Sequence, residues 1–146
     1  MMRVSAVIDR LKDQLVSIDA PVLRSVAGAG MLPSVPDVLK FTNSAFVIPK
    51  QELPGPNIAG TGIVMQQVEK RVSVLIGFVR MNQRKIGDLD SVEDVVEAVK
   101  TAMIGWVPTG EQSPVTYAGG GVAYQDFNQG LLIWACDFAC PYFVEI

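Results

Sequence analysis

Few side chains in this 146-residue chain are of the types that carry out chemistry. The sequence has no histidine, which removes the commonest general base and metal ligand and, with it, most Ser-His and Cys-His nucleophile systems. Its only thiols are Cys136 and Cys140, whereas a structural zinc site needs four ligands. The residue types therefore predict no catalytic centre, no metal site and no cofactor.

The two cysteines fall on a segment that reads as one strand. Four residues along a strand span roughly 13 Å at about 3.3 Å per residue, which is too far for a disulfide between Cys136 and Cys140. We expect both to be reduced, buried thiols of a cytosolic protein.

An acidic cluster precedes one predicted helix. Paired carboxylates can do acid-base work or bind Ca²⁺, but acids at a helix start also offset the helix dipole. The structural interpretation is favoured for this cluster, which consists of Asp88, Asp90, Glu93 and Asp94.

A glycine pair and the two tryptophans each allow a structural and a functional interpretation. Gly28 and Gly30 resemble the start of a dinucleotide-binding fingerprint, but residue 33 is Pro33 and not the third glycine, so a loop is expected there. Trp106 and Trp134 either line a ligand pocket or, as is more common, belong to the core.

Two helices are predicted from apolar residues at three- and four-residue steps. The first spans 2–15, and the second begins with Ser91 as its cap and ends before Gly105, which is expected in the left-handed conformation. The two apolar stripes are Val4, Val7, Ile8, Leu11 and Leu15, and Val92, Val95, Val96, Val99 and Met103.

Strands are predicted over 45–48, 63–80, 115–124 and 131–144, with a further short one over 22–26. Pro49 is expected to stop the first, glycines 119–121 to form a bulge, and Pro141 to mark an edge or a bulge. The long strand turns apolar on its second face near Leu75 and Val79, which predicts cover on both faces at that end. These elements predict an α+β fold, with a mostly antiparallel sheet of about four to five strands and two main helices on one face.

The run 51–62 is rich in proline and glycine and is expected to be a flexible loop. The chain length suits one domain over 1–146. In an assembly, such a loop can reach a neighbouring subunit, whereas in a lone monomer it is a liability.

Composition limits the partners. Twelve basic and fifteen acidic residues give a net charge of −3, which argues against a nucleic-acid-binding domain. The sequence has no run of about 18 consecutive apolar residues, so no membrane span is expected. The N-terminus lacks the apolar centre of a signal peptide. The positive mean hydropathy of +0.31 indicates either an apolar surface that meets another subunit or a valine-rich core.

The order of these elements resembles the tail terminator (minor tail protein) family of long-tailed bacteriophages and prophages. The resemblance is carried by Val-Ile-Asp-Arg-Leu-Lys (7–12), Ala-Phe-Val-Ile-Pro (45–49) with the Pro/Gly-rich run after it, and Gln67 leading a long strand. Further matches are Val92–Met103, Gly-Trp-x-Pro (105–108), Tyr-x-Gly-Gly (117–120) and Trp-x3-Phe-x3-Tyr (134–142).

The resemblance implies an α+β virion protein without catalytic residues. It implies a hexameric ring that caps the tail tube at its head-proximal end, stops tail polymerisation and offers an interface to the head connector or head-completion protein. The protein would assemble in the host cytoplasm, and DNA would pass through the lumen without sequence-specific binding.

We expect the 51–62 loop and the 81–86 connection to contact neighbouring subunits or the tube. The residues proposed for these contacts are Lys50, Gln51, Glu52, Asn57, Gln83, Arg84 and Lys85. Two alternatives stay open: a head-tail connector or tail-completion subunit, and a small ligand-binding α+β domain with a pocket at the tryptophans.

Overall fold

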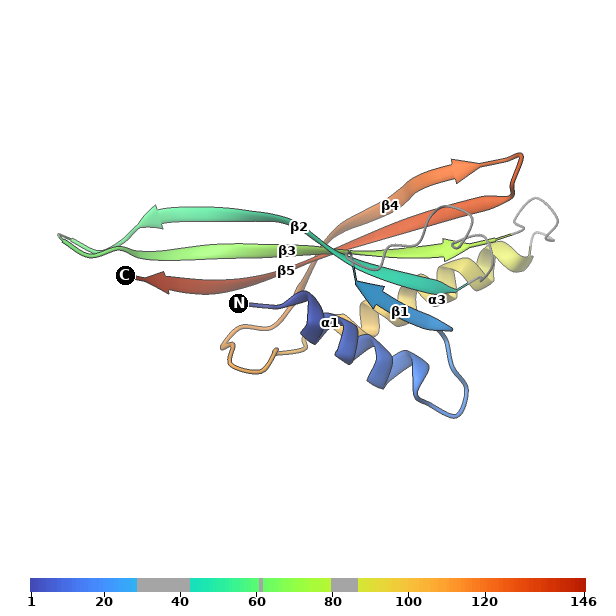
Figure 1. The fold of residues 1–146 in the computed structure, drawn as a ribbon, viewed down its shortest axis with the longest axis horizontal. Coiled ribbons are helices and arrows are strands. Elements are labelled where there is room, and N and C mark those ends of the chain that lie inside the picture. The colour runs from blue at the N-terminus through green and yellow to red at the C-terminus, as the bar shows by residue number, and fades with distance from the viewer. Residues whose placement is uncertain (29–42, 61, 80–86) are drawn as a thin grey trace.

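A computed structural model describes residues 1–28, 43–60, 62–79 and 87–146 (Figure 1). Gly28 is described, but Gly30, the segment 31–41 and the connection 81–86 lie outside the described residues. What the sequence predicts for them stays a prediction.

The fold is built on one five-stranded sheet with the order β1-β2-β3-β5-β4 (Figure 1). The strands are β1 (Ser25–Gly28), β2 (Ser44–Asn57), β3 (Met65–Phe78), β4 (Thr116–Asp126) and β5 (Leu131–Glu145). β1 is parallel to β2, and the other three pairs are antiparallel. With its two helices, the sheet confirms the predicted mostly antiparallel α+β fold.

Both helices pack against one face of this sheet. Helix α1 (Val4–Leu11) continues into the short π-helical segment η1 (Lys12–Val16), and α3 (Gly87–Met103) crosses beside it (Figure 1). Their apolar stripes meet alternate residues of the strands, as predicted. The main core includes Val7, Leu11, Leu15, Val92, Val96, Val99, Met103, Ala45, Val47, Val72, Val74, Ile76, Phe78, Leu132, Cys136, Phe138 and Cys140.

A smaller apolar cluster lies on the other side of β3. It contains buried Phe46, Val79 and Leu131, and Leu75 and Ile133 pack against it. The apolar second face expected near Leu75 and Val79 is therefore present at this end of the sheet.

The predicted start of the second helix is wrong. Helix α3 begins at Gly87, so Ser91 lies inside it and is not its cap. Asp90 then falls in the first turn, where a carboxylate interacts favourably with the helix dipole. At the other end the prediction is confirmed: Gly105 has φ of +87°, and the Trp106 N–H donates to the Met103 carbonyl at 3.2 Å.

Strand β2 is longer than predicted, and the loop expected over 51–62 is wrong for residues 51–57. The strand passes Pro49 and Pro54 and ends at Asn57, with register shifts after Pro49 and Pro54. The reason is its position. Among the described residues, β1 pairs with β2 only as far as Val47, so the rest of β2 is an edge in that part of the chain, where a missing proline N–H breaks no ladder. Flexibility of this segment stays a prediction.

The glycine-rich part of β4 contains the expected bulge. Its register against β5 shifts between Tyr117 and Gly119, and Gly119 has φ of +130°. β4 stops pairing with β5 at Ala139, so Pro141 also lies on a stretch of edge strand, as predicted.

Beyond the helices, the strands β2, β3 and β5 continue together as a three-stranded extension (Figure 1). We call this extension the arm and define it as the described residues of 50–71 together with 140–146.

Gly120 is expected to be less replaceable than Gly121 in the β4 bulge. A Cβ there would lie 2.8 Å from the backbone oxygen of Ala135 and against the hydroxyl of Tyr117, whereas a Cβ on Gly121 would meet nothing within 4 Å. Because the β5 backbone cannot easily yield, Gly120→Ala should lower the free energy of unfolding by about 1–3 kcal/mol.

The matched control is Gly121→Ala, which should be neutral or stabilising by up to about 1 kcal/mol because it restricts the unfolded chain. Urea unfolding of the three proteins measures the difference. Equal stabilities for the two variants would contradict the close approach at Gly120.

Candidate assembly surfaces

The described residues offer no reactive cluster. No group of three or more His, Cys, Asp or Glu side chains in that part of the chain is placed to hold a metal ion. Among the described helices, none is long and apolar enough to cross a membrane.

The two cysteines are free and completely buried, as expected from their spacing. Burial raises the pKa of the Cys136 thiol to about 11, although the nearby Lys100 ammonium acts in the opposite direction. Burial also raises the pKa of Cys140. Both thiols therefore stay protonated near neutral pH, which is the opposite of what a nucleophilic cysteine requires.

The tryptophans belong to the core. Trp106 and Trp134 are partly buried and pack against the main core, and the Arg10 guanidinium lies 5.6 Å from the centre of the Trp106 ring. Arg10 also donates from Nε to the Ala102 carbonyl at 2.9 Å. These contacts tie α1 to the end of α3, and the alternative of a ligand pocket at the tryptophans receives no support from them.

At the base of the arm, an ion pair joins β2 to β5. The Lys50 ammonium donates to Oδ2 of Asp137. Because β3 lies between these two strands in the sheet, the pair spans the width of β3 over Ser73, which is the residue opposite Asp137. Lys50 thus has a partner in its own chain.

A second polar contact crosses the arm farther out. The Tyr142 hydroxyl donates to Oε1 of Glu52 at 3.0 Å, and Lys70 Nζ lies 3.8 Å from the same oxygen. Burial and the hydrogen bond to Glu52 raise the pKa of Tyr142, so it keeps this proton at neutral pH. The contact again connects β2 with β5 across β3.

Asn57 organises the end of the arm. Its Oδ1 accepts from the N–H groups of Ala59 and Met65 at 3.1 and 3.0 Å, and the Ile58 N–H donates to the Met65 carbonyl. These bonds close the connection between β2 and β3 and give Asn57 a structural role.

The sequence-predicted contact residues are therefore brought together only in part. Lys50, Gln51, Glu52 and Asn57 all lie on β2 in the arm, and Gln51 is the exposed residue opposite Arg71. The other three, Gln83, Arg84 and Lys85, lie outside the described residues.

Sequence reasoning missed the apolar surface at the end of the arm. Six large apolar side chains are exposed there, and no regular alternation of polar and apolar residues predicted their exposure. We call them the tip patch: Leu53, Ile58, Ile63, Val64, Phe143 and Ile146. The available signal was the presence of Ile58, Ile63 and Val64 within a run otherwise rich in glycine and proline.

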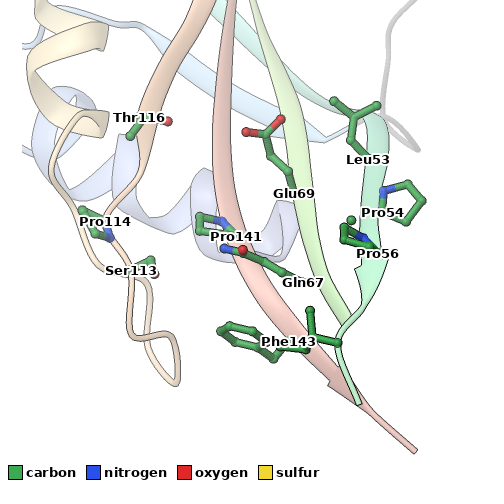
Figure 2. Close-up of a pocket in the computed structure, with 12 residues that line it drawn as sticks. Leu53, Pro54, Pro56, Gln67, Glu69, Ser113, Pro114, Thr116, Pro141 and Phe143 are labelled. Carbon is green, nitrogen blue, oxygen red and sulfur yellow. The ribbon is translucent and has the colours of Figure 1, made fainter. Parts of the chain in front are cut away.

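A groove of about 750 Å³ leads along the arm from this patch. Figure 2 shows Leu53, Gln67, Glu69 and Phe143 on the arm strands, and Ser113 and Pro114 across the groove on the loop before β4. Its lining is mostly proline and apolar side chains, with Glu69 as its carboxylate. Glu69 accepts from Arg71 Nε at 2.8 Å.

A second exposed apolar surface lies at the other end of the sheet (Figure 1), where β4 turns into β5. We call it the hairpin patch, and its members are Leu89, Val122, Tyr124 and Phe127. Leu89 and Phe127 border a recess of about 200 Å³ with Leu131 and Leu132. The molecule thus carries an apolar surface at each end.

Large exposed apolar patches can mark protein–protein interaction sites. A family model for phage tail terminator proteins matches residues 1–146, the whole chain. The chain therefore belongs to this family, which confirms the resemblance, and it is a structural protein of the phage tail. A sequence search of curated proteins finds no match.

The buried thiol predicts a pH dependence of stability. Because the pKa of Cys136 rises from 9.0 to about 11 on folding, the native state keeps a proton that the unfolded state releases between these values. Stability should therefore be complete below pH 9 and fall as the pH rises from 9 to 11, by roughly 2–3 kcal/mol from this group.

Chemical denaturation of the native chain and Cys136→Ala, at intervals from pH 8 to 11, checks this effect. The variant should show a shallower decline over the same interval, since the other titrating groups are common to both proteins. Parallel curves would show that the thiol ionises equally in both states.

Proposed function

We propose that this tail protein forms a ring of identical subunits, hexameric by family resemblance, which caps the tail tube at its head-proximal end and stops tail polymerisation. The ring would also present a surface to the head connector. The observation that carries the proposal is the arm. It extends beyond the helices and ends in six exposed apolar side chains, which a lone subunit leaves in water.

The sheet edges support assembly as well. The sheet ends in β1 on one side, which has four residues, and in β4 on the other, which has eleven. β4 contains no proline or lysine, the residues that often protect an edge. A cyclic arrangement of head-to-tail contacts can cover such edges without leaving a free end.

The arm is the part of the chain most suited to reach a neighbour or the tube. Lys50, Glu52 and Asn57 stiffen it from within through their own hydrogen bonds and ion pairs. Contacts of these residues and of Gln51 with a partner remain part of the proposal, as do contacts of Gln83, Arg84 and Lys85.

The charge balance suits a ring through which DNA passes. Phosphate binding depends on Lys and Arg, and the chain has a net charge of −3. On the arm, Lys50 and Arg71 face the carboxylates of Asp137 and Glu69. We therefore propose passage of DNA without sequence-specific binding, in particles assembled in the host cytoplasm.

Tail length tests the proposed function. Particles made without this protein should carry tails of heterogeneous, increased length, because nothing would stop addition of tube subunits. Electron microscopy of tails from the phage that encodes the chain, with and without its gene, gives the length distribution.

Supplying the intact chain in trans is the control and should restore a single length. Tails of normal length that fail to join heads would instead favour a head-tail connector or completion subunit. Normal tails on infectious particles would overturn both assignments.

A further inference from the structure

We propose that the tip patch of one subunit docks on the hairpin patch of the next copy of the same chain. This inference rests on the proposed ring and identifies the two surfaces that would build it. It concerns apolar side chains, which differ from the polar residues that sequence reasoning selected.

The size of the tip patch supports an interface. The exposed fractions of its six residues, from 36% for Leu53 to 85% for Ile146, add up to about three whole residues. At about 200 Å² for an aromatic side chain, which is an upper figure for the aliphatic members, this is at most roughly 700 Å². A standard interface buries about 800 Å² per partner. The tip patch therefore supplies most of one side of an interface.

The tip patch also wraps around both faces of the arm. Val64 and Ile146 form a backbone pair, with each N–H donating to the other's carbonyl at 2.9 Å. Phe143 lies opposite Gln67, three residues along the same ladder, and therefore points to the other face of the sheet. A tip that is apolar on both faces is better covered by a partner surface that surrounds it than by one that contacts a single face.

The hairpin patch provides a receiving surface of matching character. Phe127 and Tyr124 are exposed there, beside the recess of about 200 Å³, which is on the scale of one large side chain. Val122 and Tyr124 pair with consecutive residues of β5, Trp134 and Ile133, so they point to opposite faces. Both ends of the sheet therefore expose apolar side chains on two faces.

The occupant we assign is a second copy, because the two patches are different and lie at opposite ends of one sheet (Figure 1). A contact between two unlike surfaces of the same chain is heterologous. In a dimer joined by such a contact, one subunit keeps a free tip patch and the other a free hairpin patch. Every patch is covered only when the successive contacts close into a ring. The geometry thus favours a ring over a two-fold dimer.

Site-directed cross-linking tests the pairing. The variants Phe143→Cys and Phe127→Cys each place one exposed thiol, while the native cysteines are fully buried and make the unmodified chain a suitable control. A short bis-maleimide should cross-link a mixture of the two variants into dimers at least tenfold more than either variant alone. The reaction is run on the protein in solution and on assembled tails.

Dimers from either single variant at the level of the mixture would show a like-with-like contact and overturn the pairing. Absence of cross-links both in solution and on tails of normal length would also overturn it, while leaving the tail-length function standing. If loss of the gene leaves tail length unchanged, the proposed function fails, whatever the cross-linking shows.

Charge insertion gives an independent readout of the same pairing. Phe143→Asp and Phe127→Asp should each weaken self-association at least tenfold, and a mixture of the two should recover a dimer but no larger ring, since one intact contact remains. Ile104→Asp is the matched control, because Ile104 is similarly exposed but belongs to neither patch. Its association should be unchanged. Native mass spectrometry of the mixtures, with circular dichroism to confirm folding, would refute the proposal if Phe143→Asp assembles like the control.

Discussion

The structure depends on the pairing of β3 with β5 over their full fourteen-residue register, from Met65 opposite Glu145 to Phe78 opposite Leu132. Fourteen residues of strand span about 46 Å, whereas the seventeen residues of α3 span about 25 Å. The helices can therefore cover only part of the sheet. One part becomes a core with apolar residues on its helix-facing side, and the remainder projects as the arm.

This mismatch of lengths explains where polar and apolar side chains lie. Where α1 and α3 cover the sheet, alternate residues such as Val72, Val74 and Phe138 are buried completely. In the arm none of the described helices lies behind the strands, and side-chain contacts add to the backbone ladders that join them. The Lys50–Asp137 ion pair and the Glu52–Tyr142 hydrogen bond each cross β3. The arm is thus supported locally while its end remains apolar and exposed.

For a protein of the tail terminator family, this division assigns separate tasks to the two parts of the sheet. The buried thiols and tryptophans stabilise the body, and the raised pKa of Cys136 agrees with a packing role. The exposed ends hold the surface that remains for partners. The head-to-tail arrangement proposed above would use both ends at once and would cover the apolar side chains at these two distant places.

Much of the body follows from the sequence alone, because its signals are local. The valine stripe of α3, the alternation in β3 and β5, Gly105 after the helix, and the glycine bulge in β4 each reflect a periodicity or a backbone conformation that neighbouring residues impose. The absence of histidine is likewise a property of the sequence itself, and it removes the commonest general base.

The tertiary structure alone decided the arm. Pro49 and Pro54 indicated the end of a strand, yet β2 continues because β1 stops pairing at Val47 and leaves an edge, where a proline breaks no hydrogen bond. The polar residues 50, 52 and 57 resembled contact residues, but the first two have partners on β5, and the third bonds the adjoining connection between β2 and β3. The sequence also did not predict which apolar side chains remain exposed to water. Their exposure depends on where the helices end over the sheet, and no local sequence pattern encodes that position.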